Sequence, residues 1–172
     1  TPGGEVRHPV SNAVMNATPL GGEPATTETG QDPRGALANW MLAPENPYFA
    51  RAMANRVWGH FFGRGIVHPV DDFRASNPPT NPELLDALAD DFAEHEFDLK
   101  HLMRRIMQSR LYQLSSVPNE TNIQDTRDFS RFYRRRLGAE NLEDIVAQVT
   151  GVTSTYSNLR SDARKVELWT TK

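Results

Sequence analysis

Residues 46–63 read NPYFARAMANRVWGHFFG, and the rest of the predicted architecture is built around them. Asn46 followed by Pro47 is typical of a helix start, and Gly63 is typical of a helix end. The apolar residues between them cover well over half of a helical wheel; they are Phe49, Ala50, Met53, Ala54, Val57, Trp58, Phe61 and Phe62. A stripe this wide predicts a central helix, packed on several sides, with Trp58 buried.

Further helices are predicted on both sides of this stretch. Asp32-Pro33 and Asn81-Pro82 repeat the start signal, and Asp98 precedes a run with apolar residues at helical spacing. The predicted fold is mainly α, an irregular bundle of about six helices with an extended N-terminal arm. At most a minor β-pair is expected, from the arm or from residues 64–73. The predicted helices cover residues 33–43, 47–63, 81–95, 98–113, 129–137 and 139–150.

The chain is predicted to have three parts. Residues 1–31 are rich in Gly, Pro, Thr and Glu and show no sustained period, which favours an extended arm or linker. Residues 32–151 contain the periodic apolar segments and are predicted to form the helical core. Residues 152–172 are interpreted as a truncated C-terminal extension, because the apolar pattern weakens there.

Composition excludes several classes of protein and site. Hydrophobic residues make up 38% of the 172 positions, which is too many for a disordered chain. No apolar run approaches the roughly 18 residues of a membrane-spanning helix, so no membrane span is expected. The chain contains no cysteine, which excludes disulfides, thiolate metal sites and covalently attached haem within this segment.

Charge is divided along the chain. Residues 1–99 carry 6 Lys/Arg and 14 Asp/Glu, whereas residues 100–136 carry 9 Lys/Arg and 3 Asp/Glu. The basic segment includes Arg131 and residues 134–136, interleaved with aromatic residues. This interleaving resembles a nucleic-acid surface, but the aromatic residues have the spacing of a buried helix face. A salt-bridged link to the acidic helix at 81–95 is therefore favoured, and no nucleic-acid partner is predicted.

A polar set is predicted to fasten the loop at 64–79 to the central helix. His60 falls between Phe49 and Met53 on the helical wheel, so it is expected on a buried face, where its ring nitrogens need partners. A core histidine is favoured over a metal-binding or catalytic one. Arg56 lies one turn earlier and is expected to bind Asp72. The predicted network consists of Asn55, Arg56, His60, Arg64 and Asp72.

A second, less favoured arrangement uses His60, His68, Asp71 and Asp72 as a ligand cluster. Nitrogen and carboxylate ligands of this kind suit zinc, manganese or calcium, and two carboxylates could also form a hydrolytic pair. The spacing matches no defined metal signature, and no phosphate loop or nucleophile elbow occurs. No catalytic, cofactor-binding or metal-ligating residue is therefore assigned.

Three stretches carry a family resemblance: NRVWGHFFGRG at 55–65, PTNPELLD at 79–86 and YRRRL at 133–137. In this order they resemble the planctomycete-specific family of domains of unknown function that has the number fifteen fifty-three. The resemblance implies a module from large exported or periplasmic proteins that also carry cytochrome-c-like domains. It implies haem in those other domains, no cofactor in this segment, and no established activity.

The sequence favours a non-catalytic helical scaffold or interaction module within a larger extracytoplasmic multi-domain protein. Its expected partners are neighbouring domains of the same protein, with a polysaccharide or another protein as further alternatives. The rival hypothesis is a hydrolase or metal-dependent enzyme that acts on an extracellular polymer. That enzyme would use the region around His60, His68, Asp71 and Asp72.

Overall fold

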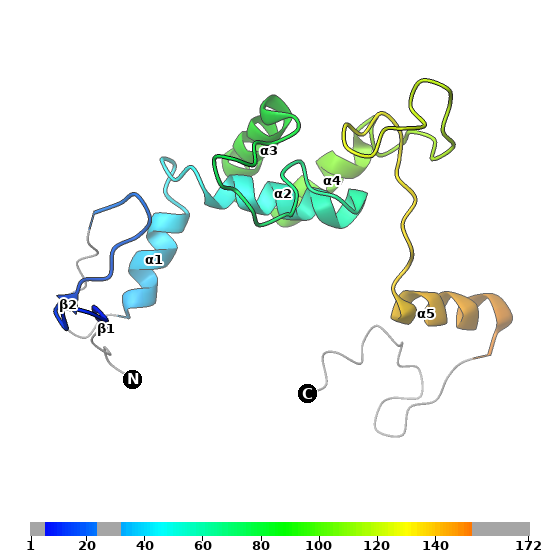
Figure 1. Cartoon of the computed structure of the whole chain (residues 1–172). Helices are drawn as coiled ribbons and strands as arrows, with labels where there is room; N and C mark the ends of the chain where they lie inside the picture. The colour runs from blue at the N-terminus through cyan, green and yellow to red at the C-terminus, as the bar shows by residue number, and fades with distance from the viewer. Residues whose placement is uncertain (1–5, 24–31, 153–172) are drawn as a thin grey trace. The chain divides into compact units, whose positions relative to one another are not determined.

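A computed structural model describes residues 6–23 and 32–152 of the chain. Within these residues the fold is mainly helical, with five helices and one two-stranded hairpin (Figure 1). The elements are β1 (Val6–Arg7), β2 (Val14–Met15), α1 (Pro33–Met41), α2 (Phe49–Phe62), α3 (Pro82–Glu94), α4 (Leu99–Gln108) and α5 (Ala139–Thr150).

The chain divides into two compact units after Tyr133. The first unit holds the hairpin and α1 to α4, and the second holds α5. The domain boundaries predicted after residues 31 and 151 stay predictions. Residues 1–5 and 24–31 of the predicted arm, and most of the predicted C-terminal extension, lie outside the described residues.

Three helix starts form as their sequences predict. The Asp32 side chain accepts a hydrogen bond from the backbone of Arg34, and Asn81 accepts one from Leu84. Asp98 accepts from the backbone N–H groups of residues 100 and 101. These bonds satisfy N–H groups that the first turn of a helix leaves without backbone partners.

The core of the first unit forms around α2, which contacts both α3 and α4. Trp58 is 1% exposed, which confirms its predicted burial. Its ring stacks on Phe62 with centroids 4.1 Å apart and meets the edge of Phe129 at 5.4 Å. Leu85 from α3 and Ile106 from α4 complete the buried cluster, so α2 is covered by both helices and by the later loop.

The predicted minor β-pair is present in the N-terminal arm. Strands β1 and β2 are antiparallel, with Val6 opposite Met15 and Arg7 opposite Val14. All four residues are exposed. This hairpin therefore contributes little to the buried core.

The helix predicted at 129–137 is wrong, because residues 129–138 have no helical structure. Phe129 has a positive φ of 57°, which no helix allows. Its backbone N–H donates to the Tyr133 hydroxyl, and the Asp125 carboxylate organises the same turn. The aromatic residues are nevertheless inward, since Phe129 is buried and Phe132 packs against the core.

The predicted salt-bridged link between the basic segment and the acidic helix takes another form. Arg131 donates to the backbone carbonyls of Asn122 and Asp125. Asp86 of α3 binds Arg51 of α2, and Asp91 of α3 lies 3.6 Å from Arg105 of α4, so the basic segment meets the acidic helix through Arg105. Helix α4 also ends at Gln108, five residues earlier than predicted. In the described part of the chain, no helix is long and apolar enough to cross a membrane.

Candidate functional site

One buried amide fastens α2 to the loop that follows it. Asn55 is completely buried, and its side chain Nδ2 donates to the carbonyl oxygens of Val67 at 2.9 Å and Val70 at 2.8 Å. Its Oδ1 accepts from the Val67 N–H at 2.9 Å. The amide thus gives hydrogen-bond partners to backbone groups of the loop that do not lie in a helix or a sheet.

Two glycines allow the loop to approach the helix closely. A Cβ atom on Gly65 would lie 2.2 Å from the Val67 carbonyl oxygen and 2.9 Å from the Asn55 amide. A Cβ atom on Gly59 would lie 2.8 Å from a methyl carbon of Val70. Any side chain at either position would push the loop away from the Asn55 amide.

The predicted Arg56–Asp72 contact does not form. Arg56 donates instead to Asp71, and the two side chains are 59% and 68% exposed. Asp72 pairs with Arg74 at 3.0 Å. The two loop carboxylates therefore bind different arginines; the Arg56–Asp71 pair is exposed, whereas the Asp72 side chain is only 26% exposed.

His60 is exposed, which corrects the prediction that it lies on a buried face. Phe49 and Met53 share its side of α2 and pack against the core; Phe97 covers Phe49, with centroids 5.4 Å apart. That cover does not extend to the last turn of α2, where His60 makes an edge contact with Phe61. The same face is therefore covered at one end of the helix and exposed at the other.

The remaining predicted residues are also distributed over the surface. His68 is exposed, and its backbone carbonyl accepts from Asn77. Arg64 is half-buried. Within residues 6–23 and 32–152, the only histidines and carboxylates close enough to share a metal ion lie elsewhere. The structure thus brings Asn55 to the loop and Arg56 to Asp71, but it does not gather His60, His68, Asp71 and Asp72 into one cluster.

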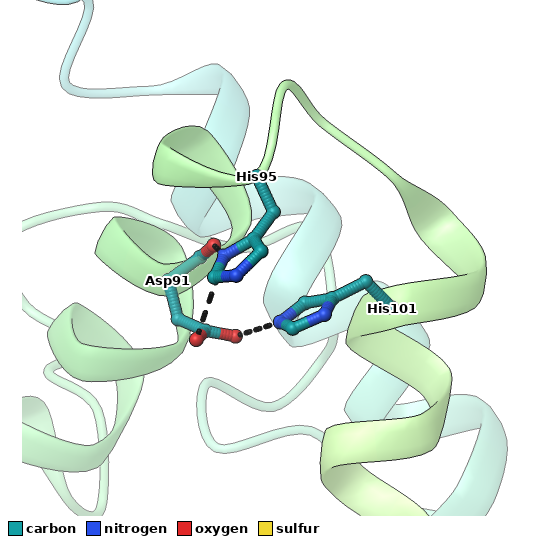
Figure 2. A group of neighbouring side chains, drawn as sticks. All are labelled: Asp91, His95 and His101. Atoms are coloured by element: carbon teal, nitrogen blue, oxygen red, sulfur yellow. Dashed lines mark hydrogen bonds and ion pairs between the residues drawn. The ribbon is translucent and has the colours of Figure 1, made fainter.

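A different polar cluster joins the end of α3 to the start of α4 (Figure 2). His101 Nε2 lies 2.8 Å from Asp91 Oδ2, and His95 Nδ1 lies 3.7 Å from Asp91 Oδ1. The two imidazole rings stack with centroids 3.7 Å apart and an interplanar angle of 12°. One ligand atom from each of the three residues lies within 4.8 Å of the others.

The turn between the helices brings these side chains together. Asp91 and His95 are four residues apart at the end of α3, so they share one side of the helix. His101 follows the N-cap Asp98 in the first turn of α4. Between them Glu96 and Phe97 have positive φ angles of 54° and 58°, and this sharp reversal places the two helix ends side by side.

Sequence reasoning missed this cluster. The signal that could have found it is an Asp–His pair at i,i+4 at the end of one helix, followed by a histidine in the first turn of the next. A short connection between two helices places such ends together. The sequence predicts only a salt-bridged link to the basic segment for the acidic 81–95 helix, whereas Asp91 also binds His101 and is 21% exposed.

Comparison with known proteins identifies the family. The model of a family described as PSD1, a protein of unknown function (DUF1553), matches residues 33–166. This chain belongs to that family. No curated protein and no solved structure gives a significant match.

The part of the chain matched by the DUF1553 family includes both polar arrangements. The Asn55 amide with its loop, and the Asp91–His95–His101 cluster, lie within residues 33–166. The family description assigns no activity to either. Any activity of this DUF1553 chain must therefore be inferred from the geometry of its own residues.

Proposed function

We propose that this chain is a non-catalytic helical scaffold or interaction module of a larger extracytoplasmic multi-domain protein. The main support for the proposal is the way the residues of the 55–65 stretch pack in the structure. This stretch has the most distinctive sequence in the chain. Its unusual residues build a packed helix and loop. They leave no converging set of reactive groups around α2 among the described residues.

Five residues of this stretch have a structural use. Asn55 holds the loop backbone, Gly59 and Gly65 allow its close approach, and Trp58 and Phe62 stack in the core. A catalytic centre would instead need a nucleophile or an acid–base pair held within reach of a substrate. The geometry of α2 and its loop is that of a rigid platform.

The rival hydrolase receives less support from the same region. Asp71 and Asp72 bind different arginines, and His60 and His68 are exposed. Surface ion pairs of this kind are common and contribute little to stability. Neither ion pair is itself the arrangement of nucleophile and general base that hydrolytic chemistry requires.

The family resemblance is what supports the extracytoplasmic location and the neighbouring domains in this proposal. Planctomycete proteins of this kind are expected to carry haem-binding domains elsewhere in the chain. The proposed partners are those neighbouring domains, with a polysaccharide or a separate protein as alternatives. A module that positions neighbouring domains needs a stable core and exposed surface, and the first unit offers both.

The proposal is tested by titrating this chain into the separately produced remainder of its parent protein and measuring heat of binding. Saturable binding with one-to-one stoichiometry is expected. In parallel, the chain is incubated with a panel of extracellular polysaccharides, and no release of reducing sugar is expected. Hydrolysis that disappears in a folded Asp71→Asn, Asp72→Asn double variant would overturn the proposal in favour of the hydrolase.

A further inference from the structure

We propose that Asp91, His95 and His101 form a binding site for a divalent transition-metal ion between α3 and α4. One carboxylate and two imidazoles are ligands that zinc and related ions prefer. One ligand atom from each residue lies within 4.8 Å of the others. Ions of this class bind at about 2.0–2.2 Å from each ligand atom and in the plane of an imidazole ring, so the two rings must rotate out of their parallel stack before one ion can lie between all three residues.

The orientation of His95 favours metal binding. Its Nδ1 lies 2.8 Å from the backbone carbonyl oxygen of Asp91, and a carbonyl can only accept, so Nδ1 carries the hydrogen. The neutral ring then has its lone pair on Nε2. Metal-binding histidines commonly donate their other ring N–H to a carbonyl or carboxylate in this way, which fixes the tautomer and the ring orientation.

The contact between Asp91 and His101 supplies the other two ligands. Asp91 Oδ2 and His101 Nε2 are 2.8 Å apart and share a hydrogen bond (Figure 2). To bind a metal ion through Nε2, a neutral His101 ring would carry its hydrogen on Nδ1 instead, and a protonated ring would release its Nε2 proton to water; the Asp91 oxygen and the His101 nitrogen would then both bind the ion. Asp91 and His101 are each 21% exposed and His95 is 47% exposed. Solvent therefore reaches the site, and water can complete the coordination.

One neighbouring charge opposes the ion. Arg105 Nε lies 3.6 Å from Asp91 Oδ1, so its guanidinium competes for the carboxylate. The Arg105 side chain is 61% exposed and can move into solvent. The end of α3 is the negative end of its helix dipole and the start of α4 is the positive end of its own, so the two dipoles oppose each other at the site. A network of hydrogen bonds and ion pairs without a metal is the alternative that the experiment must separate.

Zinc is the probe. The full chain is titrated with Zn²⁺ against a chromogenic chelator, and one ion per chain is expected with a micromolar or tighter Kd. His95→Gln and His101→Gln should each weaken binding by about tenfold or more, since even outer-shell losses cost this much. Arg105→Gln should tighten it several-fold. The matched control, His60→Gln with His68→Gln, removes two exposed imidazoles and should leave the affinity unchanged.

A second readout uses Co²⁺, whose visible absorption reports bound nitrogen and oxygen ligands. The spectrum should appear in the wild-type chain and in the control, and disappear in His95→Gln. Circular dichroism checks that each variant is folded. If a histidine variant does not fold, the tighter zinc binding expected of Arg105→Gln still tests the site. A wild-type Kd weaker than about 1 mM, or equal affinities in the wild type and His95→Gln, would overturn the proposal and leave only the ion-pair network.

Discussion

At the scale of single residues, Asn55 joins α2 to the following loop through three hydrogen bonds in a fully buried position. Asn55→Ala would leave the Val67 N–H and two carbonyls without these partners. We expect a loss of about 2–4 kcal/mol in the free energy of unfolding, measured by urea denaturation. Arg56→Ala is the control and should cost less than about 1 kcal/mol, because its ion pair is exposed. A larger loss for Arg56 than for Asn55 would contradict the assignment.

Gly65 is expected to tolerate no side chain. The Cβ of Gly65→Ala would overlap the Val67 carbonyl oxygen, so the variant should lose about 1–3 kcal/mol of stability. Gly35→Ala is a matched control in α1, where no atom lies within 4 Å of the added Cβ. That change should be neutral or stabilise by up to about 1 kcal/mol, since alanine favours helix. Equal effects of the two substitutions on chemical denaturation would show that the loop does not press on α2.

Trp58 is the largest of the fully buried side chains. Trp58→Ala removes the ring that stacks on Phe62 and leaves a cavity. We therefore expect the free energy of unfolding to fall by about 3–5 kcal/mol. Phe73→Ala is the aromatic control, since Phe73 is 41% exposed, and it should cost less than about 1 kcal/mol. Comparable denaturation midpoints for the two variants would place Trp58 outside the core.

At the scale of elements, the Asp125 turn replaces a predicted helix. Burial raises the pKa of the Asp125 carboxyl, but hydrogen bonds from the Ser130 hydroxyl and from backbone N–H groups outweigh burial and hold that pKa well below its ordinary value of 3.8. Burial, together with donation to Asp125, raises the pKa of the Tyr133 hydroxyl to about 12. The turn is therefore built around an ionised carboxylate and a neutral phenol.

A pH dependence follows for Asp125. Because its folded-state pKa is lowered, its contribution to stability is fully present above pH 3.8 and is lost as the pH falls further toward the folded-state value. Asp125→Asn should therefore be less stable than the wild type at pH 7, and the gap should narrow at about pH 3. Urea denaturation at both pH values measures the gap. Parallel stability curves for the two proteins would show that the turn does not lower the pKa of this carboxyl group.

Local signals predicted helix starts well and the basic segment poorly. Asp32, Asn81 and Asp98 cap helices because capping depends on a few adjacent residues. The spacing of Phe129, Phe132 and Tyr133 fits a helix, yet a turn with φ of 57° at Phe129 brings all three rings to the core. Apolar spacing records which residues are buried, but it does not distinguish a helix from an irregular segment held by one carboxylate.

The candidate sites were less predictable than the helices. A helical wheel assigns His60 to the side of Phe49, but it cannot show that neighbouring elements cover only one end of that side. The Asp91–His101 contact depends on the reversal at Glu96 and Phe97, which carry no glycine signal for positive φ. Contacts between different elements therefore required the three-dimensional structure.

At the scale of the whole molecule, the chain combines a packed first unit with surface carboxylates and histidines that do not converge around α2. A direct contact joins the acidic first part to the basic segment, since Arg105 lies near Asp91, whereas Arg131 binds backbone carbonyls. We propose that the polar residues of α2 and its loop serve the fold and the surface and include no reacting group.

The most direct test is the rate of polysaccharide hydrolysis by the full-length parent protein, compared between the wild type and a combined variant. The variant carries His60→Gln, His68→Gln, Asp71→Asn and Asp72→Asn, which remove the reactive groups and leave Asn55 and the core unchanged. We predict the same rate per folded molecule in both proteins, whatever that rate is. A loss of about tenfold or more, with an unchanged melting temperature, would contradict the account, because it would correspond to about 1.4 kcal/mol of lost transition-state stabilisation from these side chains.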